Sequence, residues 1–202
     1  MINKADEDRI ALAIAETEKK TAGEIVVVVA RAASGYHLVP IVWAAFAALA
    51  LPALLLAIFN LTAHRLYEIE LLVFGALAFA LSFGRYRFQL VPGPMKRHRA
   101  HEAAREQFTA RRISQTRAHT GVLIYVALAE RYAELVPDSG ISEVIDDATW
   151  KPVIVELTEK VKQDRAVEGT VAAVETCGAI LAEHFPPRGD NPDELPNRVV
   201  IL

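Results

Sequence analysis

The chain has 202 residues, a hydrophobic fraction of 52% and a formal net charge of −3. That length accommodates one domain of ordinary size together with a small membrane unit. The single cysteine, Cys177, excludes an intramolecular disulfide and a zinc site built on cysteines. The charged first residues, MINKADED, are not followed by an apolar segment, so the sequence predicts no secretory signal there.

The first part of the chain predicts a helix and then a buried strand. Within residues 5–20, Ile10 and Ile14 recur at helical spacing, with charged residues on the opposite face. Residues 24–30 (EIVVVVA) are mostly β-branched and show no alternation, which is typical of a central strand covered on both faces. Because helices must supply that cover, we expect an α/β fold, a small mixed sheet flanked by helices.

Residues 38–59 (LVPIVWAAFAALALPALLLAIF) predict a membrane-spanning helix because they contain no charged side chain. At about 1.5 Å per residue their helix would be about 33 Å long, whereas the hydrocarbon core of a bilayer is about 30 Å thick. The alternative is a buried helix of a globular protein. We expect the span to act also as the targeting signal.

A second span is predicted over residues 66–84. Its apolar part, 71–83, is short, but Glu68 and Glu70 at one end and Arg85 and Arg87 at the other can reach headgroup water. The alternative is a helix that lies in the interface. With the short polar segment 60–65 between them, the two spans form a two-helix transmembrane hairpin that interrupts the α/β domain.

The distribution of charge predicts the topology. Nine lysines and arginines but only two glutamates lie between residues 85 and 117, whereas the 60–70 segment has one arginine, Arg65. Positive residues stay cytoplasmic, so both termini and the α/β domain are expected in the cytoplasm. The basic cluster could also attract anionic lipid headgroups. It begins at the membrane edge, where topology already explains it, and we therefore expect no nucleic-acid partner.

The remainder of the chain completes the domain. The pattern predicts a basic helix over 94–116, strands at 120–127 and 132–137, and helices near 148–164 and 168–184. The tail 186–202 is proline-rich and then apolar, and either stays loose or packs back on the domain. We therefore divide the chain into a first part of the domain (1–33), the hairpin (34–93), a second part (94–185) and the tail. Both parts must lie on one side of the membrane, which requires an even number of spans.

Five segments together resemble the TPM domain family, which includes thylakoid-lumen phosphatase-like proteins and photosystem II repair factors. They are TAGEIVVV (21–28), TGVLIYVALAER (120–131), VPDSGI (136–141), VIDDATW (144–150) and the turn Glu168-Gly169. The resemblance is to bacterial members in which a membrane hairpin follows the first strand, and it implies the bacterial inner (plasma) membrane. It also implies an α/β fold, work beside membrane complexes, weak acid phosphatase activity in some members and calcium binding in others.

Three aspartates are the best candidates for a metal site. Asp138, Asp146 and Asp147 lie at a strand end and in the loop that follows, where carboxylates could hold a hard cation, calcium or magnesium. The resemblance implies calcium ligands in this same segment. The alternative is structural, since aspartates in these positions also cap turns and helices.

Other candidates have simpler explanations. Glu130 and Arg131 are expected to form an ion pair in a tight turn. His98 and His101 share a helix face at a spacing that metals use, but their neighbours are cationic. Cys177 lies among apolar residues and is expected to pack in the core. Asn60-Leu61-Thr62 matches the glycosylation pattern, which is usually a chance match.

These observations favour a non-enzymatic module, anchored in the lipid bilayer, that binds an unidentified membrane-protein partner and requires no cofactor. One alternative is a weak metal-assisted acid phosphatase that uses the aspartates. The other is an ion-binding or lipid-binding domain. No catalytic residue can be assigned from the sequence.

Overall fold

The computed structural model describes residues 2–187 and 195–202, with the backbone alone for residues 84–86. The chain divides into two compact units. The first comprises Met1–Ala33 and Arg97–Leu202, and the second, Ser34–Lys96, is inserted between these two segments. The predicted snorkelling of Arg85 lies outside the described side chains.

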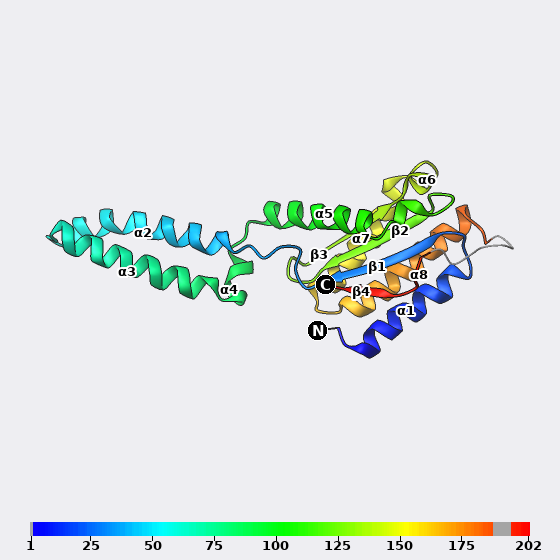
Figure 1. Cartoon of the computed structure of the whole chain (residues 1–202), viewed down its shortest axis with the longest axis horizontal. Coiled ribbons are helices and arrows are strands. Elements are labelled where there is room, and N and C mark those ends of the chain that lie inside the picture. The colour runs from blue at the N-terminus through cyan, green and yellow to red at the C-terminus, as the bar shows by residue number, and fades with distance from the viewer. Residues whose placement is uncertain (1, 188–194) are drawn as a thin grey trace. The chain divides into compact units, whose positions relative to one another are not determined.

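The first unit is built on a mixed four-stranded sheet. Its strands are β1 (Glu24–Ala30), β2 (Gly121–Ala127), β3 (Tyr132–Pro137) and β4 (Val199–Ile201), in the order β3-β2-β1-β4. β1 runs parallel to β2 and to β4, whereas β2 and β3 form an antiparallel hairpin (Figure 1). The predicted mixed sheet is thus confirmed.

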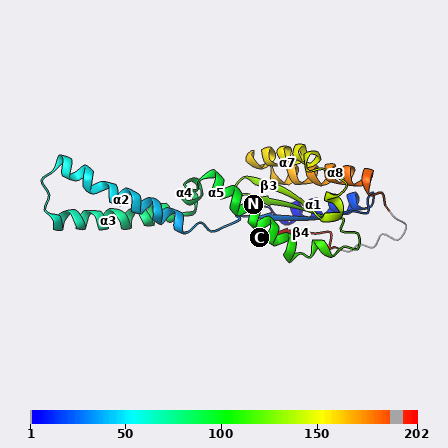
Figure 2. The same cartoon turned by 90° about the horizontal axis from the view of Figure 1, so that it is seen from above.

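Helices cover both faces of this sheet, as the unbroken apolar strands predicted. On one face lie α1 (Lys4–Glu18), α7 (Asp147–Lys162) and α8 (Ala166–His184); α5 (Gly93–Ala110) lies on the other (Figure 2). Every residue of β1 and β2 is buried. Because side chains alternate along a strand, Val27 packs with the three-helix layer and Val28 with α5.

Small residues set the distance between layers. Ala100 and Ala104 of α5 are fully buried against the sheet, where larger side chains would push the helix away. Gly178 of α8 lies so close to α1 that an added Cβ would overlap Thr17 Cγ2. Such close packing leaves no room for added volume.

Two local features differ from the sequence-based expectation, and a third decides between the two alternatives left open for the tail. The basic helix ends at Ala110 rather than continuing to 116, because Arg112 adopts a left-handed conformation (φ 56°) before a 3-10 turn, η1 (Ile113–Gln115). A short helix not predicted from the sequence, α6 (Ser139–Ser142), follows β3. The end of the tail packs back as β4, paired with β1. The earlier tail residues 188–194 lie outside the described part.

The second unit is a helical hairpin. Its helices α2 (Leu38–Ile58) and α3 (Ala63–Ser82) lie side by side in both views, followed by α4 (Gly84–Gln89) (Figures 1 and 2). Trp43 Nε1 donates to the Leu90 carbonyl at 3.1 Å and fastens α2 to the segment after α4. Among the described helices, α2 is long and apolar enough to cross a membrane. α3 is not apolar enough to meet the same criterion for a membrane-spanning helix, because charged residues occupy its first turns.

Candidate functional site

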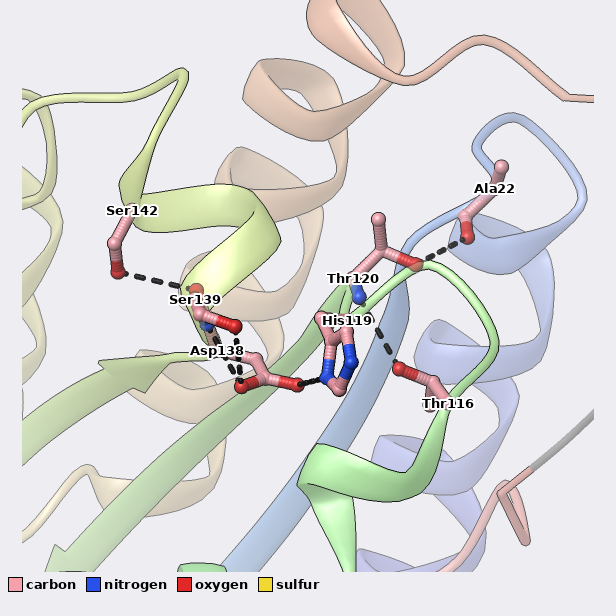
Figure 3. Close-up of polar contacts among 7 residues, drawn as sticks. All are labelled: Ala22, Thr116, His119, Thr120, Asp138, Ser139 and Ser142. Carbon is pink, nitrogen blue, oxygen red and sulfur yellow. Dashed lines mark hydrogen bonds and ion pairs between the residues drawn. The ribbon is translucent and has the colours of Figure 1, made fainter.

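A histidine–aspartate pair joins the end of β3 to the turn before β2. His119 lies in that turn with a left-handed backbone (φ 54°), which the Thr116 side chain braces by accepting from the Thr120 amide at 3.1 Å. Asp138 Oδ2 lies 3.2 Å from His119 Nδ1 (Figure 3). The carboxylate is 7% exposed and the imidazole 55% exposed, so a buried anion holds a ring that faces solvent.

Asp138 has a structural role as well. Its Oδ1 accepts the amide of Ser139 at 2.7 Å, and this hydrogen bond caps the N-terminus of α6. Gly140 in α6 sits directly against the turn, because an added Cβ would be 2.8 Å from the His119 carbonyl oxygen and would overlap that of Ala118. The cap and the close contact therefore fix the distance between Asp138 and His119.

The pair resembles part of a catalytic triad, but the order of the groups differs. In a triad the serine hydroxyl bonds the histidine, which in turn bonds the carboxylate. Here the Ser139 hydroxyl lies on the carboxylate, 3.4 Å from Asp138 Oδ1. If His119 donates through Nδ1, its Nε2 is left as an acceptor at the surface. The arrangement orients an imidazole without activating Ser139.

The three aspartates predicted to hold a cation have separate positions. Asp138 caps α6; Asp146 caps α7, where its Oδ1 accepts the Ala148 amide at 3.2 Å; Asp147 lies in the first turn of α7. Across the described residues, no three His, Cys, Asp or Glu side chains are grouped closely enough to share a metal ion. The contacts of Asp138 and Asp146 are those of the capping alternative, and the cation site stays a prediction.

Asp138 and Asp147 do meet at one surface feature, a groove of ≈ 680 Å³ between α5, the edge strand β3 and α7. We call it the edge groove. It is lined by residues of all three elements and contains acidic and basic side chains in equal number. The charged and titratable side chains in its lining are His101, Arg105, Glu134, Asp138, Asp147 and Lys151.

Two of these side chains contact each other. His101 Nδ1 of α5 lies 2.7 Å from Glu134 Oε1 of β3, and the Tyr132 hydroxyl donates to Glu134 Oε2 at 2.8 Å. Burial, and then this hydrogen bond, raises the pKa of Tyr132, so its hydroxyl remains a donor. His101 thus pairs with Glu134, while His98 pairs with Glu102 at 3.3 Å. Metal binding by the two histidines together has no support in these contacts.

Three other residues of the groove lining do not form such pairs: Arg105, Lys151 and Trp150. Within the described residues, no hydrogen bond or ion pair is recorded for the charged end of Arg105 or Lys151. Trp150 is 2% exposed, and its buried indole N–H has no acceptor among the described residues. The edge groove therefore presents two cations on opposite walls, while the indole N–H is an unsatisfied donor buried beneath its lining. Sequence reasoning missed all three, because nothing in the local pattern shows that α5 and α7 flank one strand.

The remaining sequence-based candidates are structural. Glu130 Oε1 accepts the Ala33 amide at 3.0 Å, and Arg131 has a left-handed backbone (φ 52°) in the turn before β3. The described part of the chain shows no ion pair between Glu130 and Arg131, so that expectation is wrong. Cys177 is fully buried in the core, and burial raises its pKa. The packing interpretation of Cys177 is confirmed.

Comparison with known proteins supports the resemblance found in the sequence. The TPM domain model matches residues 90–180. The NMR structure of BA42 protein from the psychrophilic bacterium Bizionia argentinensis superposes with a TM-score of 0.63 at 21% identity, over 100% of this chain and 96% of BA42. At that identity the likeness concerns the fold. No curated protein sequence matches the chain significantly.

Proposed function

This protein belongs to the TPM domain family, and we propose that it is a membrane-anchored, non-enzymatic module whose α/β unit binds a partner protein at the membrane surface. The hairpin anchors the chain, and the α/β unit presents its grooves and charged faces to neighbouring membrane proteins. No cofactor is required for this role.

The exposure of α2 carries the proposal. Only 11% of its most apolar 18-residue window is buried, although the helix has 21 residues and is apolar throughout. Phe46, Leu49 and Leu54 are each more than half exposed. A core helix of a soluble protein would bury these side chains, since each is worth about 1.5–3 kcal/mol when removed from water. A lipid environment provides the missing burial.

The sheet supports a second crossing by α3. β1 precedes the hairpin and β2 follows it, yet the two strands pair in continuous register from Glu24↔Gly121 to Ala30↔Ala127. Both segments must therefore be on the same side of the bilayer, so the chain crosses an even number of times. Glu68 and Glu70 lie near the start of α3, and carboxylates close to the end of a span can reach headgroup water.

The basic segment supports a cytoplasmic position of the α/β unit at a bacterial inner membrane. Lys96, Arg97 and Arg99 follow the hairpin closely, and α5 carries them. Positive residues close to a span are retained on the cytoplasmic side. They also favour anionic lipid headgroups, which adds about 1 kcal/mol of attraction per charge near the surface.

A metal-assisted acid phosphatase is the second candidate. It is favoured by one observation: Asp138 and Asp147 line the same groove as Arg105 and Lys151, so carboxylates for a hard cation lie near cations for a phosphate. Asp147→Asn removes one ligand without removing a cap. If a phosphatase activity of the full chain requires calcium or magnesium and is lost in Asp147→Asn, this second function replaces the first.

Membrane fractionation tests the anchor directly. We expect the full chain to remain with the membrane after extraction with alkaline carbonate and to require detergent for release. The matched control replaces residues 38–82 with a flexible linker, and this variant should be recovered in the soluble fraction. Release of the full chain by carbonate alone would mean that the hairpin does not span the bilayer.

A further inference from the structure

Two segments that are 50 residues apart in sequence meet at the end of the helical hairpin where α2 begins. His37, the residue before α2, has its Nδ1 3.0 Å from Nη1 of Arg87 in α4. The rings of Tyr36 and Phe88 pack edge to face beside them, with centroids 5.8 Å apart. Both overall views show α4 at the same end of the hairpin as the start of α2 (Figures 1 and 2). We call these four residues, all in the second compact unit, the hairpin base.

The contact with Arg87 orients the imidazole of His37. An arginine side chain has donors only, so His37 Nδ1 accepts and Nε2 carries the hydrogen of a neutral ring. The space beside Nε2 is open because residue 35 is a glycine, where an added Cβ would lie 2.5 Å from Nε2. His37 is exposed, and its side chain does not cap α2. The hairpin base therefore presents the His37 N–H donor next to the Arg87 guanidinium.

The positive charge of Arg87 is not compensated by a nearby carboxylate. Its imidazole partner is neutral, and its contacts among the described residues include no acidic side chain. Between residues 34 and 96 the acidic residues are Glu68 and Glu70. α3 continues from Glu70 for twelve residues, about 18 Å along its axis, before it ends at Ser82. Arg87 therefore keeps a charge that an anion from outside the chain can balance.

We propose that the hairpin base binds the phosphate of an anionic phospholipid headgroup. The Arg87 guanidinium and the Nε2–H of His37 donate to the phosphate oxygens. A guanidinium suits this role because it combines a permanent charge with paired hydrogen bonds that match phosphate geometry. The inference rests on the proposed function in placing α2 and α3 in the bilayer, since the end of a span lies at the depth of the headgroups.

The apolar surface next to His37 favours a lipid over a free phosphate ion. Leu38, Val42 and Trp43 follow His37 in α2, and each is about half exposed or more. Acyl chains of a lipid whose headgroup is at the hairpin base can cover these side chains, whereas a phosphate ion leaves them uncovered. An anionic lipid is favoured over a zwitterionic one, because a choline headgroup carries a cation that Arg87 would repel.

Native mass spectrometry of the full chain, released from detergent micelles, tests the proposal. The chain is titrated with phosphatidylglycerol, with phosphatidylcholine and with inorganic phosphate. We expect one phosphatidylglycerol to bind per chain, at least about tenfold more tightly than phosphatidylcholine, and to resist displacement by inorganic phosphate. Equal binding of the two lipids would overturn the proposal. Displacement by inorganic phosphate would also overturn it, because the site would then be one for free anions.

Neutral variants separate a formed site from general attraction to positive charge. His37→Ala removes the donor, and Gly35→Ala fills the space beside Nε2 without backbone strain, since Gly35 has no positive φ. Each should weaken phosphatidylglycerol binding about tenfold, the usual effect of one hydrogen bond to a charged group. Arg87→Gln should abolish the preference for the anionic lipid. Arg65→Gln removes the same charge at the opposite end of α3 and is the matched control.

Thermal unfolding of each variant in the same detergent checks that it folds. Unchanged lipid binding in folded His37→Ala and Gly35→Ala would overturn the proposal, as would an equal loss of binding in Arg65→Gln. The titration is made in micelles and does not depend on carbonate extraction. Failure of the anchor and failure of the hairpin base are therefore distinguishable.

Discussion

His119 Nδ1 and Asp138 Oδ2, 3.2 Å apart, link a left-handed turn to the end of the edge strand (Figure 3). The two residues are separated by the whole β2–β3 hairpin in sequence, and the contact closes that hairpin at its open end. The same carboxylate caps α6, so one side chain fixes the turn, the strand end and the short helix that follows. Its substitution should therefore affect stability more than a single capping contact does.

We expect Asp138→Ala to lower the free energy of unfolding by about 2 kcal/mol, because the variant loses an N-cap worth about 1 kcal/mol and a charge-assisted hydrogen bond. Asp138→Asn should lose less, since an asparagine oxygen still accepts the Ser139 amide. Thermal unfolding of the full chain in detergent measures both. Asp146→Ala, which removes only the cap of α7, is the control and should cost about 1 kcal/mol. Equal effects of the two alanine variants would mean that the contact with His119 adds nothing.

Gly140→Ala should destabilise the fold by about 1–3 kcal/mol, the usual range for overpacking. The added methyl group would meet the Ala118 and His119 carbonyl oxygens, which are backbone atoms and cannot move aside cheaply. Gly75→Ala is a matched control, because Gly75 has no atom within 4 Å of an added Cβ. Unfolding measurements that give the same stability for both variants would show that α6 and the 118–119 turn can separate without cost.

Stability should fall at alkaline pH because of Cys177. Burial raises the pKa of its thiol, so the folded chain keeps the proton while the unfolded chain releases it above about pH 8.5. The contribution is therefore complete below that pH and decreases above it by about 1.4 kcal/mol per pH unit. Burial also raises the pKa of Tyr125 to about 12, which extends the decline above pH 10.

Unfolding of the full chain under reducing conditions, compared between pH 8 and pH 9.5, measures this slope. Cys177→Ala removes the titrating thiol and should show a flatter profile in the same window, whatever its stability at neutral pH. An identical slope in the variant would assign the alkaline loss to other groups.

The sequence predicts those strands that can be recognised from their own residues. β1 and β2 are unbroken apolar runs, and such runs are read correctly because burial on both faces demands them. β4 has only three residues after a proline-rich segment, and its extended state comes from pairing with β1. The sequence therefore left two alternatives open for the tail and did not predict a strand in it. The end of α5 was not predicted because the residue that adopts the left-handed conformation there, Arg112, is not a glycine, and so the sequence gives no signal of a helix end.

Site residues were predicted less well because their partners are distant in sequence. The three aspartates were grouped by proximity along the chain, yet Asp146 is occupied as the cap of α7 while Asp138 faces His119. His101 was considered with His98 on one helix face, whereas its partner is Glu134 on a strand. The edge groove depends on the position of α5 and α7 beside β3. Only the tertiary structure supplies that information.

The proposed topology can be tested by cysteine labelling, because Cys177 is the single native cysteine and is fully buried. In a Cys177→Ala background, Thr62→Cys places a thiol between α2 and α3, and Gln163→Cys places one on the exposed end of α7. A membrane-impermeant maleimide applied to intact cells should modify Thr62→Cys alone. Gln163→Cys should react only after permeabilisation, since the α/β unit is proposed to be cytoplasmic. The reverse result would place the α/β unit outside the cytoplasm, and equal labelling of both positions would mean that the hairpin does not cross the bilayer.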